Sequence, residues 1–376
     1  MPVDLREYRL VYIGPAEGQT AVGDYAENFV NAVRPLFGEV VQRRTLGPGA
    51  ETVAQVRGHR RAVADLVAGG KPGRVLVHAE LAAGAVSAFW SIAGLRGVPV
   101  TATVHDPPQG IWWPGRTKFV ARHKLVMHGL HYPLRPVSRM LEGMVNGDRT
   151  LFALSQVGAQ SIRDTYPKTD VAYAPYLVCD RPKIRPVIER PKAVGFFGHV
   201  YRGKGFEQIE RLRELLPADI GIRVAGRGTE ALPKADGIDI LGAVDGSDED
   251  AFFESVRAIV VPYGKRHFYA ESFAASGVVA HSTAYCTPQI CTNYGSLAEL
   301  DETVGALVVR LNKVGAPADS DTVAGELAAA ITALVNDDAR VRELGENSAR
   351  TREERSATRT GEAFAAAWSE MLGLDG

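Results

Sequence analysis

The chain has 376 residues, of which 45% are hydrophobic and 23% are charged, and its formal net charge is −1. This length exceeds one typical hydrophobic core and predicts two domains. A charge so close to zero excludes a global electrostatic field that would attract nucleic acid or a membrane. The three cysteines, Cys179, Cys286 and Cys291, form neither a disulfide framework nor a Cys-x-x-Cys pair, so no metal site is expected.

The amino terminus carries charges at Asp4, Arg6, Glu7 and Arg9 and has no apolar core, so we expect no signal peptide. No apolar run approaches the roughly 18–20 residues that span a bilayer. The sequence therefore predicts a cytoplasmic protein, with the inner face of the membrane as an alternative location.

Apolar, β-branched runs alternate with segments of helical periodicity in the first half of the chain. This order is typical of a parallel sheet with helices on both faces, whose strands are continuous apolar runs. The predicted strands are 9–13, 39–41, 75–77, 98–104, 149–154 and 171–175, and the predicted helices are 22–37, 51–68, 82–95 and the segment ending at Tyr166.

Three prolines lie among charged residues between Cys179 and Pro191, which predicts a linker between two domains. The second half repeats the strand–helix alternation. Its predicted strands are 193–197, 220–225, 239–241, 258–261 and 288–292, and residues 337–372 are predicted to be largely helical. The predicted fold class is therefore α/β, with two doubly wound domains that meet at a cleft. Because ligands bind at the carboxyl ends of such strands, functional residues should follow strands directly.

A glycine-rich loop with two cations connects the predicted strand 193–197 to a predicted helix. The loop runs from Gly198 to Gly205 and contains Arg202 and Lys204. Free backbone N–H groups, a positive helix end and point charges bind phosphates at this place in α/β proteins. A second such loop contains Gly226 and allows a base or ribose to approach the backbone. For each loop the alternative is a tight turn without a ligand.

A third strand in this half is followed by a predicted helix start with a capping residue. Ser276 is the expected N-cap, and Gly277 allows a ligand to approach the first turn. A diphosphate held between this positive helix end and Lys204 would be stabilised as it leaves a breaking glycosyl bond. The alternative is an ordinary capped helix that binds nothing.

In the first half, two candidate loops follow strands. The segment 14–23 has three glycines but does not match Gly-x-Gly-x-x-Gly, so a dinucleotide fingerprint is absent. His105 and Asp106 end the strand 98–104, where they are suited to binding a sugar hydroxyl or a phosphate, or to proton transfer. The alternative is that Asp106 caps a turn while His105 fills a structural hydrogen bond.

Residues 111–149 form a basic segment with interleaved apolar residues. It begins with Trp112 and Trp113 and contains the cations Arg116, Lys118, Arg122, Lys124, Arg135 and Arg139. A basic amphipathic stretch of this kind docks on anionic lipid headgroups, so we expect peripheral membrane or acceptor contact through 111–140. The alternative is an excursion that packs its aromatic rings inward while its charges face water.

Several segments match motifs in order along the chain: Val22–Phe29, Thr103–Asp106, Phe197–Gly205, Ala284–Ile290 and Tyr294–Glu299. The first is similar to a Gly-Gly-x-Gly-x-Tyr helix start, and the second, at Thr103–Asp106, to a Thr-x-His-Asp strand end. Phe197–Gly205 is similar to a Val-Gly-Arg-Leu-x-x-x-Lys-Gly loop. Ala284–Ile290 is similar to an Ala-x-Gly-x-Pro-Val-Val segment, and Tyr294–Glu299 to a Gly-Gly-x-x-Glu ending. Over nearly its whole length the chain thus resembles the retaining glycosyltransferases of the family 4 type.

The resemblance implies the GT-B fold, which is α/β with two Rossmann-like, doubly wound domains facing a central cleft. Residues 1–185, with a C-terminal helix at about 356–376 packing back on them, would form the acceptor-side domain. Residues 190–355 would form the nucleotide-sugar domain. The chain departs from the family pattern at His199, where the family has arginine, and at Phe273 and His281, where it has paired glutamates.

Motifs and resemblance together predict the residues of the site. We expect His105, His199 and Lys204 in catalysis, with Lys204 against the diphosphate. The predicted donor-binding residues are Gly198, Arg202, Gly226, Arg227, Glu271, Ala275, Ser276, Gly277, Val278 and His281. The acceptor side is expected to use Gly23, Asp106, Trp112 and Trp113.

The function implied is retaining, metal-independent transfer of a hexose from a UDP- or GDP-type sugar, without a further cofactor. The acceptor would be a carbohydrate, a lipid-linked molecule or a small molecule, and no nucleic-acid partner is expected. Retention by same-face attack, with the leaving phosphate oxygen accepting the proton, is implied by the resemblance alone. The alternative is a catalytically inactive sugar- or nucleotide-binding protein of the same fold, which the missing glutamates favour. A dehydrogenase is disfavoured by the absent dinucleotide fingerprint.

Overall fold

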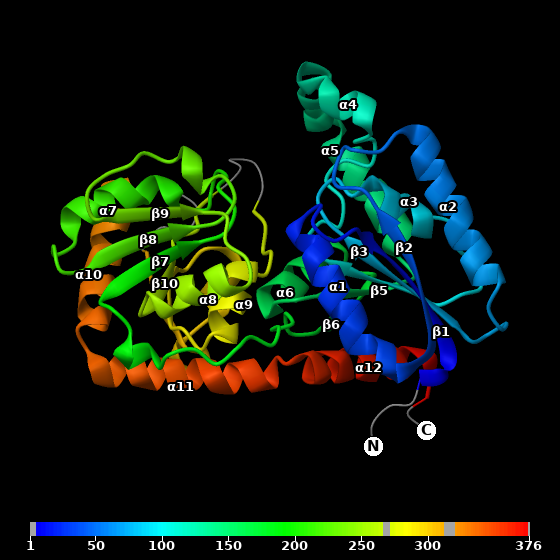
Figure 1. Cartoon of the computed structure of the whole chain (residues 1–376). Helices are drawn as coiled ribbons and strands as arrows, with labels where there is room; N and C mark the ends of the chain where they lie inside the picture. Colours follow the sequence, from blue (N-terminus) through cyan, green and yellow to red (C-terminus); the bar gives the residue numbers. More distant parts are fainter. Residues whose placement is uncertain (1–4, 266–270, 312–319, 375–376) are drawn as a thin grey trace. The chain divides into compact units, whose positions relative to one another are not determined.

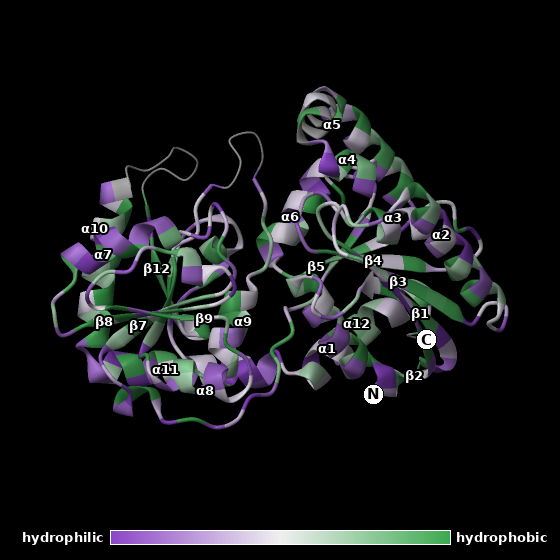
Figure 2. Ribbon diagram, turned by 45° about the horizontal axis from the view of Figure 1, so that its top comes forward, coloured by the Kyte–Doolittle hydropathy of each residue, from purple (hydrophilic) through white to green (hydrophobic). Residues whose placement is uncertain are grey.

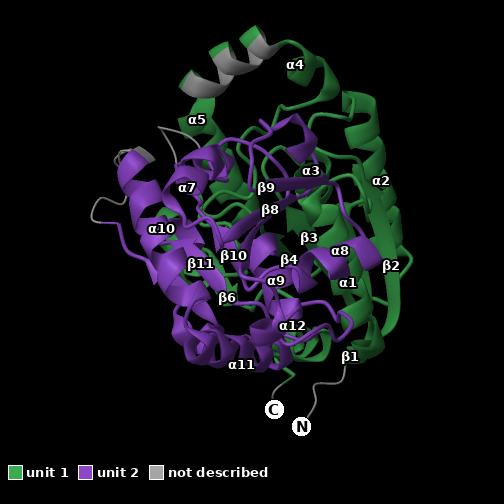
Figure 3. Cartoon of the chain, turned by 60° about the vertical axis from the view of Figure 1, so that its left-hand side comes forward, with its two compact units in different colours: residues 1–177, 272–275, 357–376 green, residues 178–271, 276–356 purple. Residues whose placement is uncertain are grey.

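The computed structural model describes residues 5–265, 271–311 and 320–374 (Figure 1). The chain divides into two compact units, coloured separately in Figure 3. Unit 1 comprises residues 1–177, 272–275 and 357–376, and unit 2 comprises residues 178–271 and 276–356. Both units are therefore assembled from segments that are distant in sequence.

Unit 1 contains a six-stranded sheet in the order β2-β1-β3-β4-β5-β6, and every neighbouring pair is parallel. The strands are β1 Leu5–Pro15, β2 Phe37–Thr45, β3 Val75–Leu81, β4 Val100–Val104, β5 Thr150–Ala153 and β6 Asp170–Tyr173. The chain reverses its direction of travel across the sheet between β1 and β3, which lie side by side. This point is where doubly wound sheets bind ligands.

Helices cover both faces of the unit 1 sheet. They are α1 Ala21–Val33, α2 Val53–Ala68, α3 Val86–Ile92, α4 Lys118–Arg122, α5 Lys124–Asn146, α6 Gln156–Thr165 and α12 Ala357–Leu372. One face packs aliphatic strand residues against α2, α3 and α6. The other face packs against α1 and α12, where Phe29, Phe152, Phe364 and Trp368 form an aromatic cluster.

Unit 2 contains a second parallel sheet, in the order β12-β11-β10-β7-β8-β9. The strands are β7 Ala193–Phe197, β8 Gly221–Ala225, β9 Ile238–Gly242, β10 Ala258–Val261, β11 Gln289–Thr292 and β12 Ala306–Val309. Helices α7 Ile209–Leu215, α10 Ser320–Val335 and α11 Asp338–Glu354 cover one face, and α8 Ser247–Glu254 and α9 Gly277–Ala284 cover the other. The switch point lies between β7 and β10.

The α/β prediction is confirmed, and several element boundaries differ from the sequence-based expectation. The helix expected over 22–37 ends at Val33, because Pro35 has no backbone N–H to continue it and lies in a short 3-10 turn over Arg34–Leu36. The helix expected over 82–95 is shorter, since Gly84 and Gly94 take positive φ angles of 84° each. Strand β12 was not predicted, although its four residues form a short continuous apolar run.

The linker expected between Cys179 and Pro191 belongs to unit 2. Its residues from Val187 to Glu189 form a 3-10 turn, and Arg190 is buried in the unit. The Arg190 guanidinium donates to the carbonyl oxygens of Phe253, Val256 and Tyr285, at 3.1, 3.4 and 3.2 Å. These bonds fix the proline-rich segment to the α8 region, so the chain passes between units at Leu177–Val178 instead.

In the part of the chain that the structure describes, none of the helices is both long enough and apolar enough to cross a membrane.

Candidate functional site

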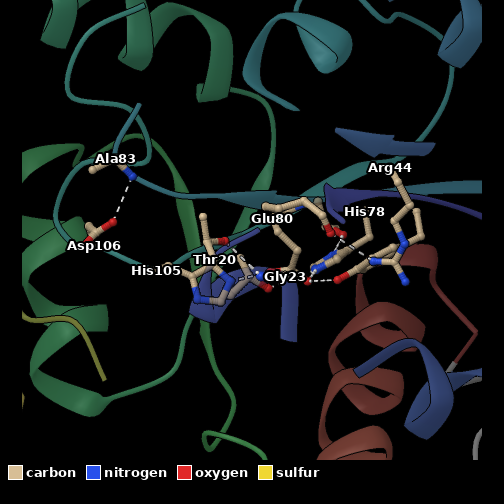
Figure 4. Close-up of polar contacts among 12 residues, drawn as sticks. Thr20, Gly23, Arg44, His78, Glu80, Ala83, His105 and Asp106 are labelled. Atoms are coloured by element: carbon tan, nitrogen blue, oxygen red, sulfur yellow. Dashed lines mark hydrogen bonds and ion pairs between the residues drawn. The ribbon is translucent and has the colours of Figure 1, made fainter. Parts of the chain in front are cut away.

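A row of polar side chains crosses one face of the unit 1 sheet, under α1 and α12. Tyr12 of β1 pairs with His78 of β3, and Glu80 of β3 pairs with Thr103 of β4. Since alternate residues of a strand share a face, His78 and Glu80 lie on the same face, in line with Thr103 and His105. Figure 4 labels His78, Glu80 and His105 of this row, which leads to the carboxyl ends of β3 and β4.

Glu80 is the centre of this row, and it is fully buried. Its carboxylate accepts a hydrogen bond from the Tyr12 hydroxyl at 2.7 Å and lies 2.6 Å from Nε2 of His105. The carboxylate oxygen also lies 3.5 Å from Nε2 of His78. Burial raises the pKa of Glu80, but hydrogen bonds and charge from His105 and His78 outweigh it and hold this pKa at about 2.

The ionised Glu80 determines how His105 presents its ring. An ionised carboxylate only accepts hydrogen bonds, so Nε2 of His105 carries the proton and donates to it. In the neutral ring, Nδ1 is then the acceptor nitrogen. The ring itself packs edge-on against Tyr25 of α1 at 5.1 Å between centroids. His105 therefore has a fixed orientation at the end of β4, and its Nδ1 is the nitrogen that accepts a hydrogen bond when the ring is neutral.

Two further predicted residues of unit 1 hold the loops around this strand end. Asp106 accepts a hydrogen bond from the backbone N–H of Ala83 at 2.9 Å, which ties the loop after β4 to the loop after β3. Gly23 lies in the first turn of α1, where its N–H donates to the Thr20 hydroxyl at 3.1 Å. A side chain at Gly23 would approach the Ala16 carbonyl oxygen to 2.2 Å, so only glycine allows this loop to pack.

Trp112 and Trp113 are half-buried in the connection between β4 and α4. Their predicted role at the acceptor side stays a prediction, as does that of Gly23 and Asp106. Tyr12, His78 and Glu80 were not predicted. A buried parallel strand is expected to be apolar, and the predicted strand therefore stopped at Val77. The period-two spacing of His78 and Glu80 was the available signal.

In unit 2 a short chain of polar contacts forms at the switch point between β7 and β10. The Lys204 ammonium group donates to the Tyr263 hydroxyl and lies 3.7 Å from the centroid of the same ring. The Tyr263 hydroxyl in turn is 2.9 Å from the Ser276 hydroxyl. Lys204 follows β7, Tyr263 follows β10 and Ser276 begins α9, so the tertiary fold joins two predicted residues through one that was not predicted.

The start of α9 is built as expected. The Ser276 hydroxyl accepts from the N–H of Val279 at 3.3 Å and so caps the helix. Gly198 has a φ of 111°, and a side chain there would lie 3.1 Å from the Val278 side chain. A side chain at Gly226 would approach the Gly198 carbonyl oxygen to 2.0 Å. Both glycine loops therefore pack closely together beside the first turn of α9.

The catalytic candidate His199 and the other donor-binding candidates take different places. His199, Arg202 and Arg227 are exposed in the loops after β7 and β8. His281 joins a separate network, where its Nδ1 lies 2.9 Å from Glu249 of α8. Burial raises the pKa of Glu249, but hydrogen bonding and charge from His281, with the charge of Arg181, lower it overall.

The segment 272–275 belongs to unit 1, although it was expected within the second domain. The Phe273 N–H donates to the Pro107 carbonyl oxygen at 2.9 Å, and its own carbonyl accepts from the Ser155 hydroxyl at 3.1 Å. These bonds tie the segment to unit 1, and unit 2 resumes at Ser276. Glu271, which precedes the segment, is exposed. Phe273, which stands where the resembled family has a glutamate, therefore contributes backbone bonds beside the β4 loop.

Among the residues that the structure describes, no cluster of three His, Cys, Asp or Glu side chains could hold a metal ion.

No protein-family model matches the sequence, and a search of curated proteins found no relative. Solved structures do match. Sucrose-phosphate synthase from Thermosynechococcus elongatus is 14% identical with a TM-score of 0.68, covering 98% of this chain and 100% of that one. HepE of Anabaena, solved with UDP and glucose, is 10% identical with a TM-score of 0.64, covering 96% and 100%.

A further similar structure is trehalose 6-phosphate synthase from Burkholderia multivorans. It is 12% identical with a TM-score of 0.63, and the match covers 98% of this chain and 97% of that one. These matches span both units, and each unit has a Rossmann-like parallel sheet. The chain has the GT-B fold. At such low identity the likeness establishes the fold, so the GT-B prediction is confirmed at that level.

Proposed function

We propose that this GT-B protein is a glycosyltransferase that moves a hexose from a nucleoside-diphosphate sugar, of UDP or GDP type, to a hydroxyl acceptor. The observation that carries this proposal is the Lys204–Tyr263–Ser276 contact chain at the switch point of unit 2. It joins a cation, a phenol and a helix start at the strand ends where doubly wound sheets bind nucleotides. Similar structures that bind UDP and glucose support the choice of donor.

In this proposal the leaving diphosphate is stabilised by Lys204 and by the first turn of α9. The first N–H groups of a helix lack intrahelical partners and carry partial positive charge, so they favour an anion. Charge develops on the diphosphate as the glycosyl bond breaks, and preorganised positive groups lower that barrier. These positive groups offset the charge of the leaving diphosphate without a metal ion or other cofactor. We therefore propose metal-independent transfer with retention.

Unit 1 contributes His105 in this proposal. Because Nε2 of His105 donates a hydrogen bond to the Glu80 carboxylate, the other ring nitrogen, Nδ1, accepts a hydrogen bond from a sugar hydroxyl. The loop after β1, which Gly23 allows to pack, forms the acceptor side. We propose a carbohydrate or lipid-linked acceptor, since sugars offer hydroxyl groups that can donate to His105 at the end of β4.

The deciding experiment is thermal unfolding of the purified chain with UDP, GDP, ADP and their hexose conjugates. A ligand at about 100 times its dissociation constant adds roughly 2.7 kcal/mol to the free energy of unfolding, which is a shift of a few degrees. We expect one nucleotide to give this shift and Lys204→Ala to abolish it. The exposed Lys234→Ala in the same unit is the matched control and should retain the shift. No shift with any nucleotide would contradict the proposal.

A second candidate is a sugar- or nucleotide-binding protein without catalytic activity. The observation that favours it is the presence of Phe273 and His281 where the resembled family has glutamates, with His281 engaged by Glu249. Donor turnover separates the two functions. A binding protein shows saturable stabilisation by the nucleotide sugar without release of nucleoside diphosphate, even when a panel of acceptors is supplied.

A further inference from the structure

Helices α4 and α5 form a helical excursion at one edge of unit 1, and they carry large apolar side chains that are exposed to solvent (Figure 1). The exposed fractions are 69% for Phe119, 90% for Leu125, 40% for Leu134, 50% for Val137, 61% for Met140 and 74% for Met144. Exposed apolar residues that gather on one element mark an interaction surface, whereas scattered ones are ordinary.

Three of these residues form a stripe on α5: Val137, Met140 and Met144. Their spacing of three or four residues places them on one side of the helix. The core-facing side is a different one, where Leu141 and Val145 pack against the unit 1 core and Ser138, Glu142 and Asn146 are buried. The helix is thus apolar toward the core and again toward solvent. Figure 2 shows hydrophobic and hydrophilic residues together on α4 and α5.

The same surface is positively charged in a chain whose formal net charge is −1. Between Pro107 and Leu141 the sequence has no acidic residue, and it contains six lysines and arginines. Of these, Lys118, Arg122 and Arg139 are exposed. A groove of about 890 Å³ adjoins the stripe; its walls include Arg139, Met140 and Lys168, with Asp148 and Asp164 also lining it.

Charge complementarity decides which partner fits this surface. A second copy of the chain would bring the same cations against one another, which opposes pairing. An anionic bilayer supplies negative headgroups for the cations and acyl chains for the stripe at the same time. An amphipathic helix with a basic flank lies in the plane of such an interface, with its apolar face among the upper acyl carbons.

We propose that the α4–α5 surface docks the protein on anionic lipid bilayers, with the stripe of α5 inserted at the interface. This deepens the proposed function, because a protein held at a bilayer meets acceptors that are anchored there. Lipid binding is nevertheless measured without donor or acceptor, so its failure and the failure of sugar transfer are separate results.

The test is flotation of the full-length protein with vesicles of phosphatidylcholine alone, and of phosphatidylcholine mixed with phosphatidylglycerol. We expect binding to the mixed vesicles, weakened as salt concentration rises. Each cation near the surface contributes about fivefold to the partition constant. The triple variant Lys118→Gln, Arg122→Gln and Arg139→Gln should therefore lose about a hundredfold. The matched control changes Arg57, Arg60 and Arg61 of α2 to Gln; all three are exposed, and binding should persist.

A second variant tests the stripe by changing Val137, Met140 and Met144 to Gln. It should lose binding to mixed vesicles while its thermal unfolding midpoint stays close to that of the parent chain, because these side chains face solvent. Three outcomes would overturn the proposal. They are the absence of binding to mixed vesicles, equal binding to uncharged vesicles, and a concentration-dependent dimer that the stripe variant abolishes, which would assign the surface to a second copy.

Discussion

Glu80 has a folded-state pKa of about 2 because His105 and His78 stabilise its ionised form, although burial opposes it. The unfolded value is near 4.5, so the group contributes stability above that pH and loses it as pH falls through about 2. A difference of this size corresponds to about 3 kcal/mol. We expect urea unfolding to show a loss of stability between about pH 5 and pH 2, and Glu80→Gln to reduce that slope.

The same substitution tests Glu80 as a positioning residue for His105. If the carboxylate orients the ring, Glu80→Gln should lower donor turnover by up to about tenfold, since one hydrogen bond from His105 to the sugar contributes about 0.5–1.5 kcal/mol. In the proposed function the nucleotide is bound by residues of unit 2, so its stabilising effect should remain at the parent level. A variant that loses nucleotide stabilisation as well would indicate general damage and not a positioning role.

Cys286 is a residue-scale exception in the backbone. Among the described residues it is the non-glycine residue with a positive φ, at 51°, and it follows the last turn of α9. Helices commonly end in a left-handed residue that is glycine, because a side chain is strained there. Cys286→Gly should raise the free energy of unfolding by up to about 1 kcal/mol. This net gain already includes the cost of the greater conformational freedom that glycine gives the unfolded chain. Cys286→Ala keeps the strain and should give no gain.

At the scale of elements, Glu142 holds three parts of unit 1 together. From α5 its carboxylate accepts from the N–H of Ile111, in the loop after β4, and from the Tyr166 hydroxyl after α6, both at 2.8 Å. Burial raises the pKa of Glu142 to about 7, and the hydrogen bonds lower it only in part. The loop that begins at His105 is therefore fastened to a carboxyl group that titrates near neutrality.

The raised pKa of Glu142 makes the free energy of unfolding depend on pH with the opposite sign to the effect of Glu80. The folded state keeps the Glu142 proton while the unfolded state releases it above about pH 4.5, so stability falls as pH rises from there through about 7. The full effect is about 3 kcal/mol. Glu142→Gln mimics the protonated group and should remove the slope in a series of urea titrations. An unchanged slope between pH 5 and pH 8 would contradict this assignment.

The elements also show where local sequence signals suffice. Ser276 has the residue type and position of an N-cap, and the structure confirms it. Helix α1 ends where Pro35 interrupts the helical pattern. The Gly198 and Gly226 loops could be located from sequence, but their close packing depends on β7 and β8 being neighbours in the sheet. Local chemistry fixes the ends of elements, and strand pairing decides which loops meet.

At the scale of the whole molecule, unit 1 is assembled from both ends of the chain. Helix α12 contacts α1 and places Phe364 and Trp368 on the sheet, and the Trp368 indole N–H donates to the Thr101 hydroxyl at 3.1 Å. Both aromatic side chains are fully buried. The face of the sheet that carries Glu80 is thus covered only when the last helix of the chain is in place.

Removal of residues 357–376 should therefore destabilise unit 1 and leave unit 2 folded. Loss of one buried aromatic side chain costs about 3–5 kcal/mol, and this deletion removes two. Hydrogen exchange should show lost protection in β1, β3 and β4 and retained protection in β7, β8 and β10. Removal of 373–376, which spares α12, is the control and should change neither unit. Retained protection in unit 1 of the shorter chain would contradict this account.

The alternation of apolar strands and periodic helices determined the α/β class and the two Rossmann-like sheets. That pattern is local, because each strand or helix shows it in its own residues. The glycine loops and His105 could be proposed from sequence for the same reason, since they directly follow strands. Lys204 could be proposed as a cation within the first of these loops, and Ser276 as an N-cap residue. Only the tertiary structure supplied Glu80 and Tyr263. Glu80 is a buried charge that contradicts the apolar pattern of its strand, and Tyr263 matters only because β10 lies beside β7. Contacts between segments distant in the chain leave no local signal, and this is why the tertiary fold was needed to assemble the candidate sites.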